Sequence, residues 1–267
     1  MSSIMASLLP EYGNLAFILI SAILCLLLGI FAYFKRVLDI KASLLAAAIG
    51  FLVIGYSDFF WFILLLLFLV VSYFVTIWKY NKKSEKGTSE GMAGERGIKN
   101  VIANGAIPFV IVLFSEPLDN LSEGLPGFLF IVAIAIATSD TFASEIGIIA
   151  QKPRLITNIG RTVEPGVDGG ISMIGNIAAF FGALLIGVFG YLLITDYLTT
   201  IGPHGLEANI LVIVLATVIG WLGCQLDSVL GATVQTRGWV TNNMVNFITI
   251  AIGVLVSIPV FLLLFSL

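Results

Sequence analysis

The chain has very little charge: only 11% of its 267 residues are Asp, Glu, Lys or Arg, whereas 59% are hydrophobic. Soluble globular domains carry about 25% charged residues, so this composition excludes a soluble protein and indicates one that crosses a membrane several times. The mean hydropathy of +1.08 points the same way. Because the net charge is only −3 and the basic residues form no stripe, we also exclude nucleic-acid binding.

Cysteine and histidine are nearly absent. The two cysteines, Cys25 and Cys224, lie in or beside apolar segments, where we expect small packing residues rather than a disulfide or a metal pair. The single histidine, His204, lies in a Gly-Pro-His-Gly turn. This scarcity argues against a histidine-based catalytic triad and against a zinc site.

Long apolar runs are plentiful instead. A helix needs about 20 apolar residues to cross the hydrocarbon core of a bilayer. The chain offers eight candidate spans, three of them short: 15–34, 42–56, 59–80, 101–114, 125–138, 170–194, 206–226 and 245–265. We therefore predict an all-α polytopic bundle of about eight transmembrane helices, some short or broken, that forms one integral membrane domain over residues 1–267.

The basic residues fall in alternate connections between these spans. All thirteen Lys and Arg follow the first, third, fifth or seventh span, whereas the intervening connections contain acidic residues and no basic ones. By the positive-inside rule the basic connections are cytoplasmic, and both termini lie outside. The two cytoplasmic segments of most interest are the polar loop 81–97 and the basic, Gly-rich loop 148–169.

Polar residues interrupt the apolar pattern after the fifth span, in the stretch "SDTFASEIG" over residues 139–147. An ionised Asp at the centre of a membrane helix costs roughly 2.5–3.5 kcal/mol, so we expect these groups to have a function. Asp140 and Ser144 share a helix face, whereas Glu145 points about 140° away from Asp140 on an ideal helix. Both carboxylates can reach one ligand only if the helix bends or ends there, or if a second subsite exists. Ser139 and Ser144 are candidate substrate contacts.

A second polar stretch, "RLITNIGRTVEPGVDGGIS" over residues 154–172, leads directly into the next span. Its glycines permit tight turns whose N–H groups can face an anion, and the N-terminus of the following helix also favours anions. A plain Gly-rich connector is the alternative, and the spacing does not match a Walker loop. Asp168 is a candidate cation ligand. The candidate substrate contacts here are Lys152, Arg154, Arg161, Gly166, Gly169, Gly170 and Ser172.

Further candidates lie on three other spans. Asp227 lies one or two turns from the end of the seventh span and is a third candidate carboxylate ligand. The amides at the start of the last span are spaced three and four residues apart and so share faces of one helix, although capping is an alternative role. The candidate binding residues on these spans are Asn242, Asn243 and Asn246, together with Arg96, Lys99 and Asn104 at the beginning of the fourth span.

All these candidates map to one membrane face. Carboxylates without His or Cys suit a hard, oxygen-preferring ion such as Mg²⁺, and basic residues beside Gly-rich backbone suit phosphates. We therefore predict a site for a Mg²⁺–nucleotide or a diphosphate at the cytosol–membrane boundary, beside an apolar volume for a lipid tail. The predicted catalytic residues are Asp140, Asp168, Asp227 and Arg161, and the predicted metal ligands are Asp140, Glu145, Asp168 and Asp227.

Four motifs also resemble those of a known family in order and spacing: "SDTFASEIG" (139–147), "GVDGGIS" (166–172), "LDSVLGATVQ" (226–235) and "WVTNNMVNF" (239–247). They are similar to an integral-membrane, cytidylyltransferase-like group that includes plant phytyl-phosphate kinase and the animal transmembrane protein nineteen. The resemblance implies a kinase that transfers the γ-phosphoryl group of CTP, or of another nucleoside triphosphate, to a polyprenyl monophosphate. It places Asp140, Glu145, Asp168, Asp227 and Asn243 in the polar site, and it departs at Val167, where we expect Thr or Ser.

Two other functions remain open at this point. A cytidylyltransferase would attack the α-phosphorus and release pyrophosphate, and no residue of the sequence distinguishes it from a kinase. An ion-coupled transporter or flippase also places carboxylates within the membrane, but here the polar residues gather at one face rather than at mid-depth. The expected partners are a nucleoside triphosphate (CTP favoured), an isoprenoid lipid phosphate and membrane lipids, with a homo-oligomer as a further expectation.

Overall fold

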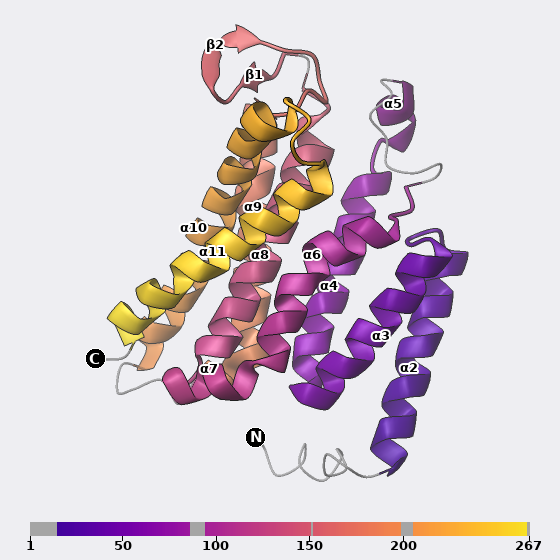
Figure 1. Ribbon diagram of the computed structural model, residues 1–267, viewed down its shortest axis with the longest axis vertical. Helices are drawn as coiled ribbons and strands as arrows, with labels where there is room; N and C mark the ends of the chain where they lie inside the picture. The colour runs from indigo at the N-terminus through magenta and orange to yellow at the C-terminus, as the bar shows by residue number, and fades with distance from the viewer. Residues whose placement is uncertain (1–14, 86–93, 151, 199–204, 266–267) are drawn as a thin grey trace.

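The computed structural model describes residues 15–85, 94–150, 152–198 and 205–265. Within these ranges the chain is mostly helical, and Figure 1 shows the long helices packed side by side as one bundle. The helices are α2 (Leu15–Phe34), α3 (Ile40–Tyr56), α4 (Phe59–Ile77), α5 (Tyr80–Glu85), α6 (Ile98–Leu113), α7 (Ser115–Leu121), α8 (Leu125–Gly147), α9 (Met173–Leu198), α10 (Gly205–Leu230), the π-helical segment η1 (Gly231–Gln235) and α11 (Asn242–Phe265).

The number of spans agrees with the prediction of about eight. Within the described ranges, six helices are long and apolar enough to cross a membrane. The pair α6 and α7, bent by 64°, forms a seventh, broken span, and α3 is a shorter apolar helix of 17 residues. The fifth span is longer than the predicted 125–138, because α8 continues through its polar residues to Gly147.

Helix α8 is the central helix of the bundle. Nearly every residue from Leu125 to Ser139 is buried, against α4, α6, α9, α10 and α11. Neighbouring helices approach it at glycines: a Cβ on Gly220 would lie 2.9 Å from the Cβ of Ala135, and one on Gly223 would lie 2.8 Å from Ile136. Small residues at such crossings let membrane helices pack closely. The polar end of α8 is therefore held by a densely packed apolar stem.

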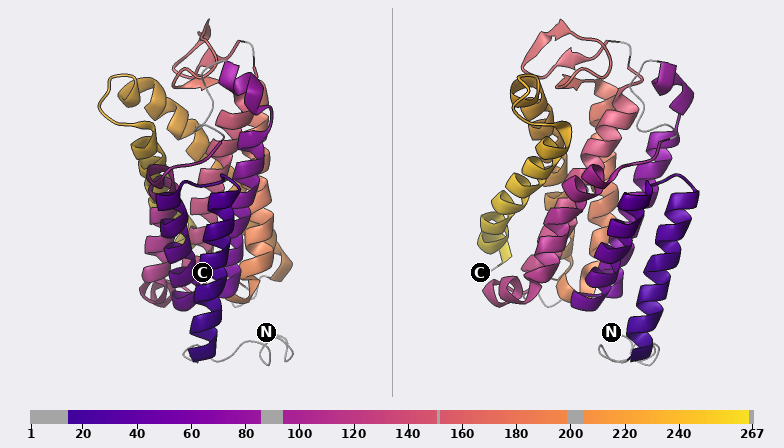
Figure 2. Two further views of the ribbon diagram at one scale, coloured as in Figure 1. Left: turned by 90° about the vertical axis from the view of Figure 1, so that its right-hand side faces the viewer. Right: turned by 45° about the vertical axis from the view of Figure 1, so that its right-hand side comes forward.

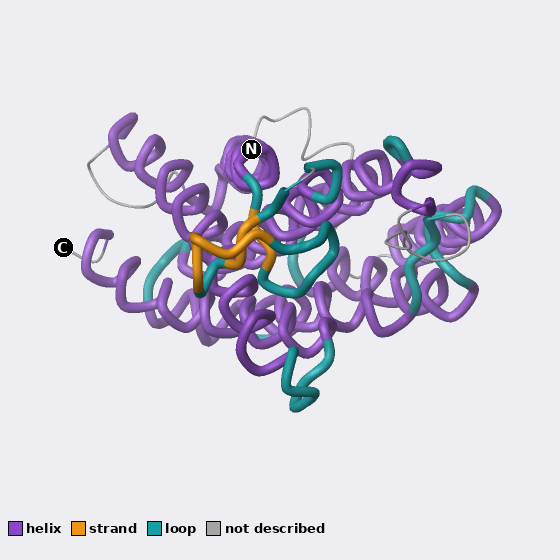
Figure 3. Tube along the Cα trace, turned by 90° about the horizontal axis from the view of Figure 1, so that it is seen from above, coloured by secondary structure: helices purple, strands orange, loops and turns teal. Residues whose placement is uncertain are grey.

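The basic, Gly-rich loop forms a small antiparallel sheet, which the all-α prediction missed. Its strands are β1 (Arg154–Leu155), β2 (Asn158–Thr162) and β3 (Gly170–Ile171), in the order β2-β1-β3. Two of the three strands have only two residues, so the sequence carries no alternating pattern by which to predict them. Figure 3, a view from above, shows the strands over the ends of the helices.

The sheet and α5 lie at one end of the bundle, whereas α2 begins and α11 ends at the other end (Figures 1 and 2). Of the predicted polar loop 81–97, α5 covers the first part and residues 94–97 form an extended strap. This strap is tied to the end of α2 by Arg96 N–H, which donates to Val37 C=O at 3.0 Å, and by Asp39 N–H, which donates to Arg96 C=O at 3.1 Å. All basic connections thus meet at the end that carries the sheet.

Candidate functional site

A pocket of about 370 Å³, here called the polar pocket, opens beneath the sheet. Its walls come from the polar end of α8, residues 165–172, the beginning of α9, the end of α10 and η1. Asp140, Asp168 and Asp227 all line it, although they come from three distant parts of the chain. Other predicted binding residues that line it are Ser144, Gly166, Gly169, Gly170, Ser172 and Asn242.

The loop that carries Asp168 is pressed against η1. Gly169 has φ +74°, and a Cβ at this position would clash with Ala232, so only glycine permits this contact. The contact places Asp168 beside Gln235. Burial raises the pKa of Asp168, and a side-chain hydrogen bond with Gln235 opposes that shift. Isolated π-helical segments such as η1 occur frequently at functional sites.

The floor of the pocket is the crossing of α8 and α9. Gly175 faces α8 so closely that a Cβ would lie 2.9 Å from the carbonyl oxygen of Ala143. Ser172 Oγ accepts from Gly175 N–H at 3.1 Å and donates to the Gly147 carbonyl at 3.3 Å. Ser172 therefore caps α9 and ties it to the end of α8, in addition to lining the pocket.

The inner wall contains polar atoms that the protein leaves unpartnered. Asn246 Nδ2 donates to Asp140 Oδ2 at 3.3 Å, which links α11 to α8. The buried atoms Asp227 Oδ2, Asn246 Oδ1 and Thr249 Oγ1 have no hydrogen-bond partner among the described residues. Buried polar atoms are nearly always satisfied, so three unpartnered oxygens from two adjacent helices call for a ligand or water. Oxygen atoms of this kind suit a hard cation.

These residues fit Mg²⁺ that arrives with a polyphosphate. Among the described residues, no group of three or more His, Cys, Asp or Glu is placed to hold a metal ion by itself. Mg²⁺, however, usually keeps several waters and is bound through one or two carboxylates plus substrate phosphates. Asp140 and Asp227, with the unpartnered Oδ2 of Asp227, match that mode of binding better than an all-protein cage.

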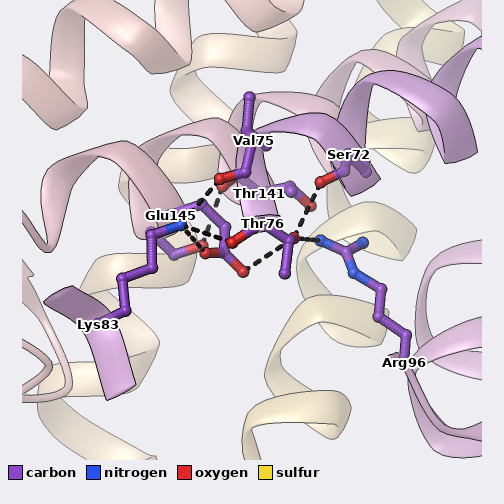
Figure 4. Close-up of polar contacts among 8 residues, drawn as sticks. Ser72, Val75, Thr76, Lys83, Arg96, Thr141 and Glu145 are labelled. Atoms are coloured by element: carbon purple, nitrogen blue, oxygen red, sulfur yellow. Dashed lines mark hydrogen bonds and ion pairs between the residues drawn. The ribbon is translucent and has the colours of Figure 1, made fainter. Parts of the chain in front are cut away.

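Glu145 does not join the other carboxylates. It lies outside the polar pocket, on a different face of α8, and pairs with Lys83 Nζ at 2.6 Å. Lys83 Nζ also donates to the carbonyls of Val75 and Thr76, at 2.8 and 3.0 Å. Figure 4 shows Lys83 and Arg96 approaching Thr76 and Glu145 from opposite sides, and Arg96 Nη2 donates to Thr76 Oγ1 at 3.2 Å. We call these four side chains the buried ion network.

Several other predicted residues also lie outside the polar pocket. Ser139 is fully buried, and its Oγ donates to the Ala179 carbonyl at 2.9 Å, which joins α8 to α9. Arg154 is exposed and its Nη1 donates to the Ile159 carbonyl at 3.4 Å. The remaining residues that do not line the pocket are Lys99, Lys152, Arg161, Asn243 and Asn246, the first three of them exposed and Asn246 reaching the site through Asp140.

Four residues of the site were missed by the sequence analysis. Thr249 lies three residues after Asn246, so the helical spacing that selected the asparagines could have found it. Asn176, four residues after Ser172, lines the pocket, and its Oδ1 accepts from Trp221 Nε1 at 2.7 Å and from Gln225 Nε2 at 3.0 Å. Gln235 lies within a quoted motif. Lys83 lies in a polar segment without periodicity, and no signal predicts its burial.

A second, larger cavity of about 420 Å³ lies between α2, α3, α4 and α6, and we call it the apolar cavity. Its lining is almost entirely hydrophobic, with Lys35, Arg96, Asn100 and Asn104 as the exceptions. Arg96 also lies close enough to Asp140 for its charge to act on that carboxylate. The strap residue Arg96 is therefore shared between the apolar cavity and the surroundings of the polar pocket.

Together these features define a class: a polytopic integral membrane protein with a carboxylate-lined pocket at one end of its helix bundle. Residues 23–254 match the family described as "Integral membrane protein DUF92", and the chain belongs to this family. The membership confirms the family resemblance predicted from the motifs. No solved structure matches the chain.

Three relatives show the extent of the similarity. An uncharacterised membrane protein of Methanocaldococcus jannaschii is 33% identical over 91% of this chain and 93% of its own length. The chloroplastic protein VTE6 of Arabidopsis thaliana is 30% identical over 71% of this chain and 56% of its own length. Protein PGR of the same plant is 27% identical over 86% of this chain and 82% of its own length.

Proposed function

We propose that this protein is a membrane lipid kinase that transfers the γ-phosphoryl group of CTP, or of another nucleoside triphosphate, to a polyprenyl monophosphate. The observation that carries the proposal is the convergence of Asp140, Asp168 and Asp227 on one polar pocket. Membership of a group that includes phytyl-phosphate kinase supports the choice of a kinase and of an isoprenoid acceptor. The positive-inside pattern supports a cytoplasmic position for the pocket.

The carboxylates have distinct roles in this proposal. Asp140 and Asp227 hold Mg²⁺ against the nucleotide phosphates, and Asn246 orients Asp140 through its hydrogen bond. Asp168, on the Gly-rich loop, closes the site from the side of the sheet. Mg²⁺, when bound, neutralises the charge on the phosphoryl group during transfer. The backbone N–H groups of residues 166–170 and the exposed cations Lys152 and Arg161 then complete the neutralisation of the nucleotide.

The reaction asks the protein chiefly for positioning and charge neutralisation. A phosphate oxygen of the lipid forms a new bond to the γ-phosphorus. The bond from that phosphorus to the bridging oxygen breaks, and the nucleoside diphosphate leaves with the electron pair. Because the acceptor is already an anionic phosphate, no strong general base is needed, which fits a chain with a single histidine.

The test is a transfer assay with the purified full chain in lipid nanodiscs, Mg²⁺, γ-labelled CTP and a polyprenyl monophosphate. We expect a labelled lipid diphosphate and free CDP. Glu116→Gln, which alters an exposed carboxylate at the opposite end of the bundle, serves as a control with full activity. Release of pyrophosphate instead would assign the same pocket to a cytidylyltransferase. No product with any of the common nucleoside triphosphates would refute both.

A further inference from the structure

The apolar cavity has a polar end and an apolar end. Lys35 follows α2, and Arg96 and Asn100 lie at the beginning of α6, so these groups share the end of the bundle that carries the sheet. The rest of the lining, from Cys25 to Phe74, is hydrophobic apart from Asn104 and a tyrosine, and none of the described residues that line the cavity is acidic. A cavity of this form complements a molecule with one anionic head and an apolar body.

A buried, unsatisfied atom also points to a ligand. Asn104 is 4% exposed, and its Oδ1 has no hydrogen-bond partner among the described residues, whereas its Nδ2 donates to the Asn100 carbonyl at 3.0 Å. An unpartnered acceptor costs about 1–3 kcal/mol when buried, so a donor is expected beside it. A phosphate hydroxyl or a water bridging to a phosphate supplies such a donor.

The cavity opens toward the lipid. Phe31 and Phe74, on α2 and α4, line the cavity and are more than half exposed. A hydrocarbon chain can therefore enter sideways from the bilayer between these two helices, without passing through water. The volume of about 420 Å³ lies at the low end of the range of small-molecule sites, which suits one hydrocarbon chain better than two.

We propose that the apolar cavity binds the single hydrocarbon chain of an isoprenoid monophosphate, with the phosphate at Lys35 and Arg96. The identity of this lipid as the acceptor rests on the proposed function. Because Arg96 also acts on Asp140, its guanidinium places the lipid phosphate beside the part of α8 that borders the polar pocket. The apolar cavity therefore selects the length and shape of the chain, and the polar pocket performs the chemistry.

The first experiment fills the cavity. Ala46 on α3 lines it, whereas Ala48 on the same helix is exposed and does not, so Ala46→Phe and Ala48→Phe form a matched pair. Binding of geranyl, farnesyl and geranylgeranyl monophosphate to the full chain in nanodiscs is measured without nucleotide. Ala46→Phe should raise the Kd for the geranylgeranyl compound about tenfold relative to the geranyl compound, as expected from overpacking. Ala48→Phe should leave the ratio unchanged.

A second cavity variant guards against misfolding of the first. A Cβ on Gly105 would meet Ile49 at 3.6 Å, an ordinary contact, so Gly105→Leu introduces a side chain from the opposite wall. It should shift the chain-length preference in the same direction as Ala46→Phe. Thermal unfolding and gel filtration of each variant identify those that are folded before their affinities are compared.

The next experiment tests the charge at the polar end. Lys35→Gln should weaken binding of geranylgeranyl monophosphate several-fold and leave binding of the neutral alcohol geranylgeraniol unchanged. Lys41→Gln is the control, because Lys41 is exposed and does not line the cavity. Equal effects on the phosphate and the alcohol would contradict a phosphate position at Lys35.

The outcomes separate this inference from the proposed function. An unchanged chain-length profile in both cavity variants, or equal competition by a two-chain phosphatidate, overturns the inference even if the wild type phosphorylates isoprenoid phosphates. The predicted shifts in binding without any phosphoryl transfer support the lipid site and overturn the kinase.

Discussion

Asp140 and Glu145 lie five residues apart on α8, and their surroundings are opposite. Glu145 is buried beside Lys83 and Thr76, with both carboxylate oxygens engaged. Asp140 lines the polar pocket, and the hydrogen bond from Asn246 engages only its Oδ2. A buried charge whose partners are complete is explained by the fold, whereas incompletely paired oxygens near Asp227 and Thr249 require something from outside. The same helix thus carries one structural and one functional carboxylate.

The comparison is broken most strongly at Lys83. Lys83→Met removes the cation and leaves Glu145 buried without its charge partner, which should cost about 3–5 kcal/mol of unfolding free energy. The double variant Lys83→Met/Glu145→Gln should recover most of that loss, because no unpaired charge remains. Unfolding is followed in mixed micelles. If both variants are equally unstable, the ion pair is not the source of the stability.

Asp140→Asn tests the functional carboxylate. Removing one charge from the proposed Mg²⁺ site should lower kcat/KM at least about a hundredfold, at or beyond the upper end of the effect of supporting residues around metals. The midpoint of unfolding should stay close to that of the wild type, because the isosteric amide keeps the packing. Near-normal turnover in this variant would place the metal elsewhere.

Thr249→Val sharpens the comparison at an unpartnered hydroxyl. If Thr249 Oγ1 faces the cation or its water, the Mg²⁺ concentration for half-maximal activity should rise about tenfold. Stability should not fall, because no protein hydrogen bond is lost.

Thr76→Val is the matched control, since Thr76 Oγ1 lies 2.9 Å from the Ser72 carbonyl and 3.0 Å from Glu145 Oε1. It should lower stability and leave the Mg²⁺ dependence unchanged. The opposite assignment of the two effects would contradict the distinction between satisfied and unsatisfied groups.

The fold was largely predictable because apolar runs of bilayer length leave few alternatives to spanning helices. The small sheet was not, since β1 and β3 have two residues each and their pairing depends on contacts across the loop. The carboxylates of the polar pocket were also predictable: Asp140, Asp168 and Asp227 interrupt or adjoin apolar helices, where a charge is costly without a role.

The remainder of the site depends on information that spacing does not contain. The angle of about 140° between Asp140 and Glu145 indicated that they face different ways, but nothing in a polar loop indicates that Lys83 reaches Glu145. Arg154 and Arg161 look like phosphate ligands by residue type, yet their strands direct them to the surface. Residue type and helical angle identify candidates, and only the packing of distant segments decides which of them meet.

The smallest effect is expected at Ser139, which the sequence analysis assigned to the substrate. Its Oγ donates to the Ala179 carbonyl, and the side chain is fully buried away from the polar pocket. Ser139→Ala should therefore cost about 1 kcal/mol of unfolding free energy, the net value of one hydrogen bond, and leave kcat and KM unchanged. Ser144→Ala, on the pocket side of the same helix, provides the comparison, because it should raise KM for the nucleotide. A kinetic defect in Ser139→Ala with normal stability would show that the two faces of α8 are not divided as the hydrogen bonds indicate.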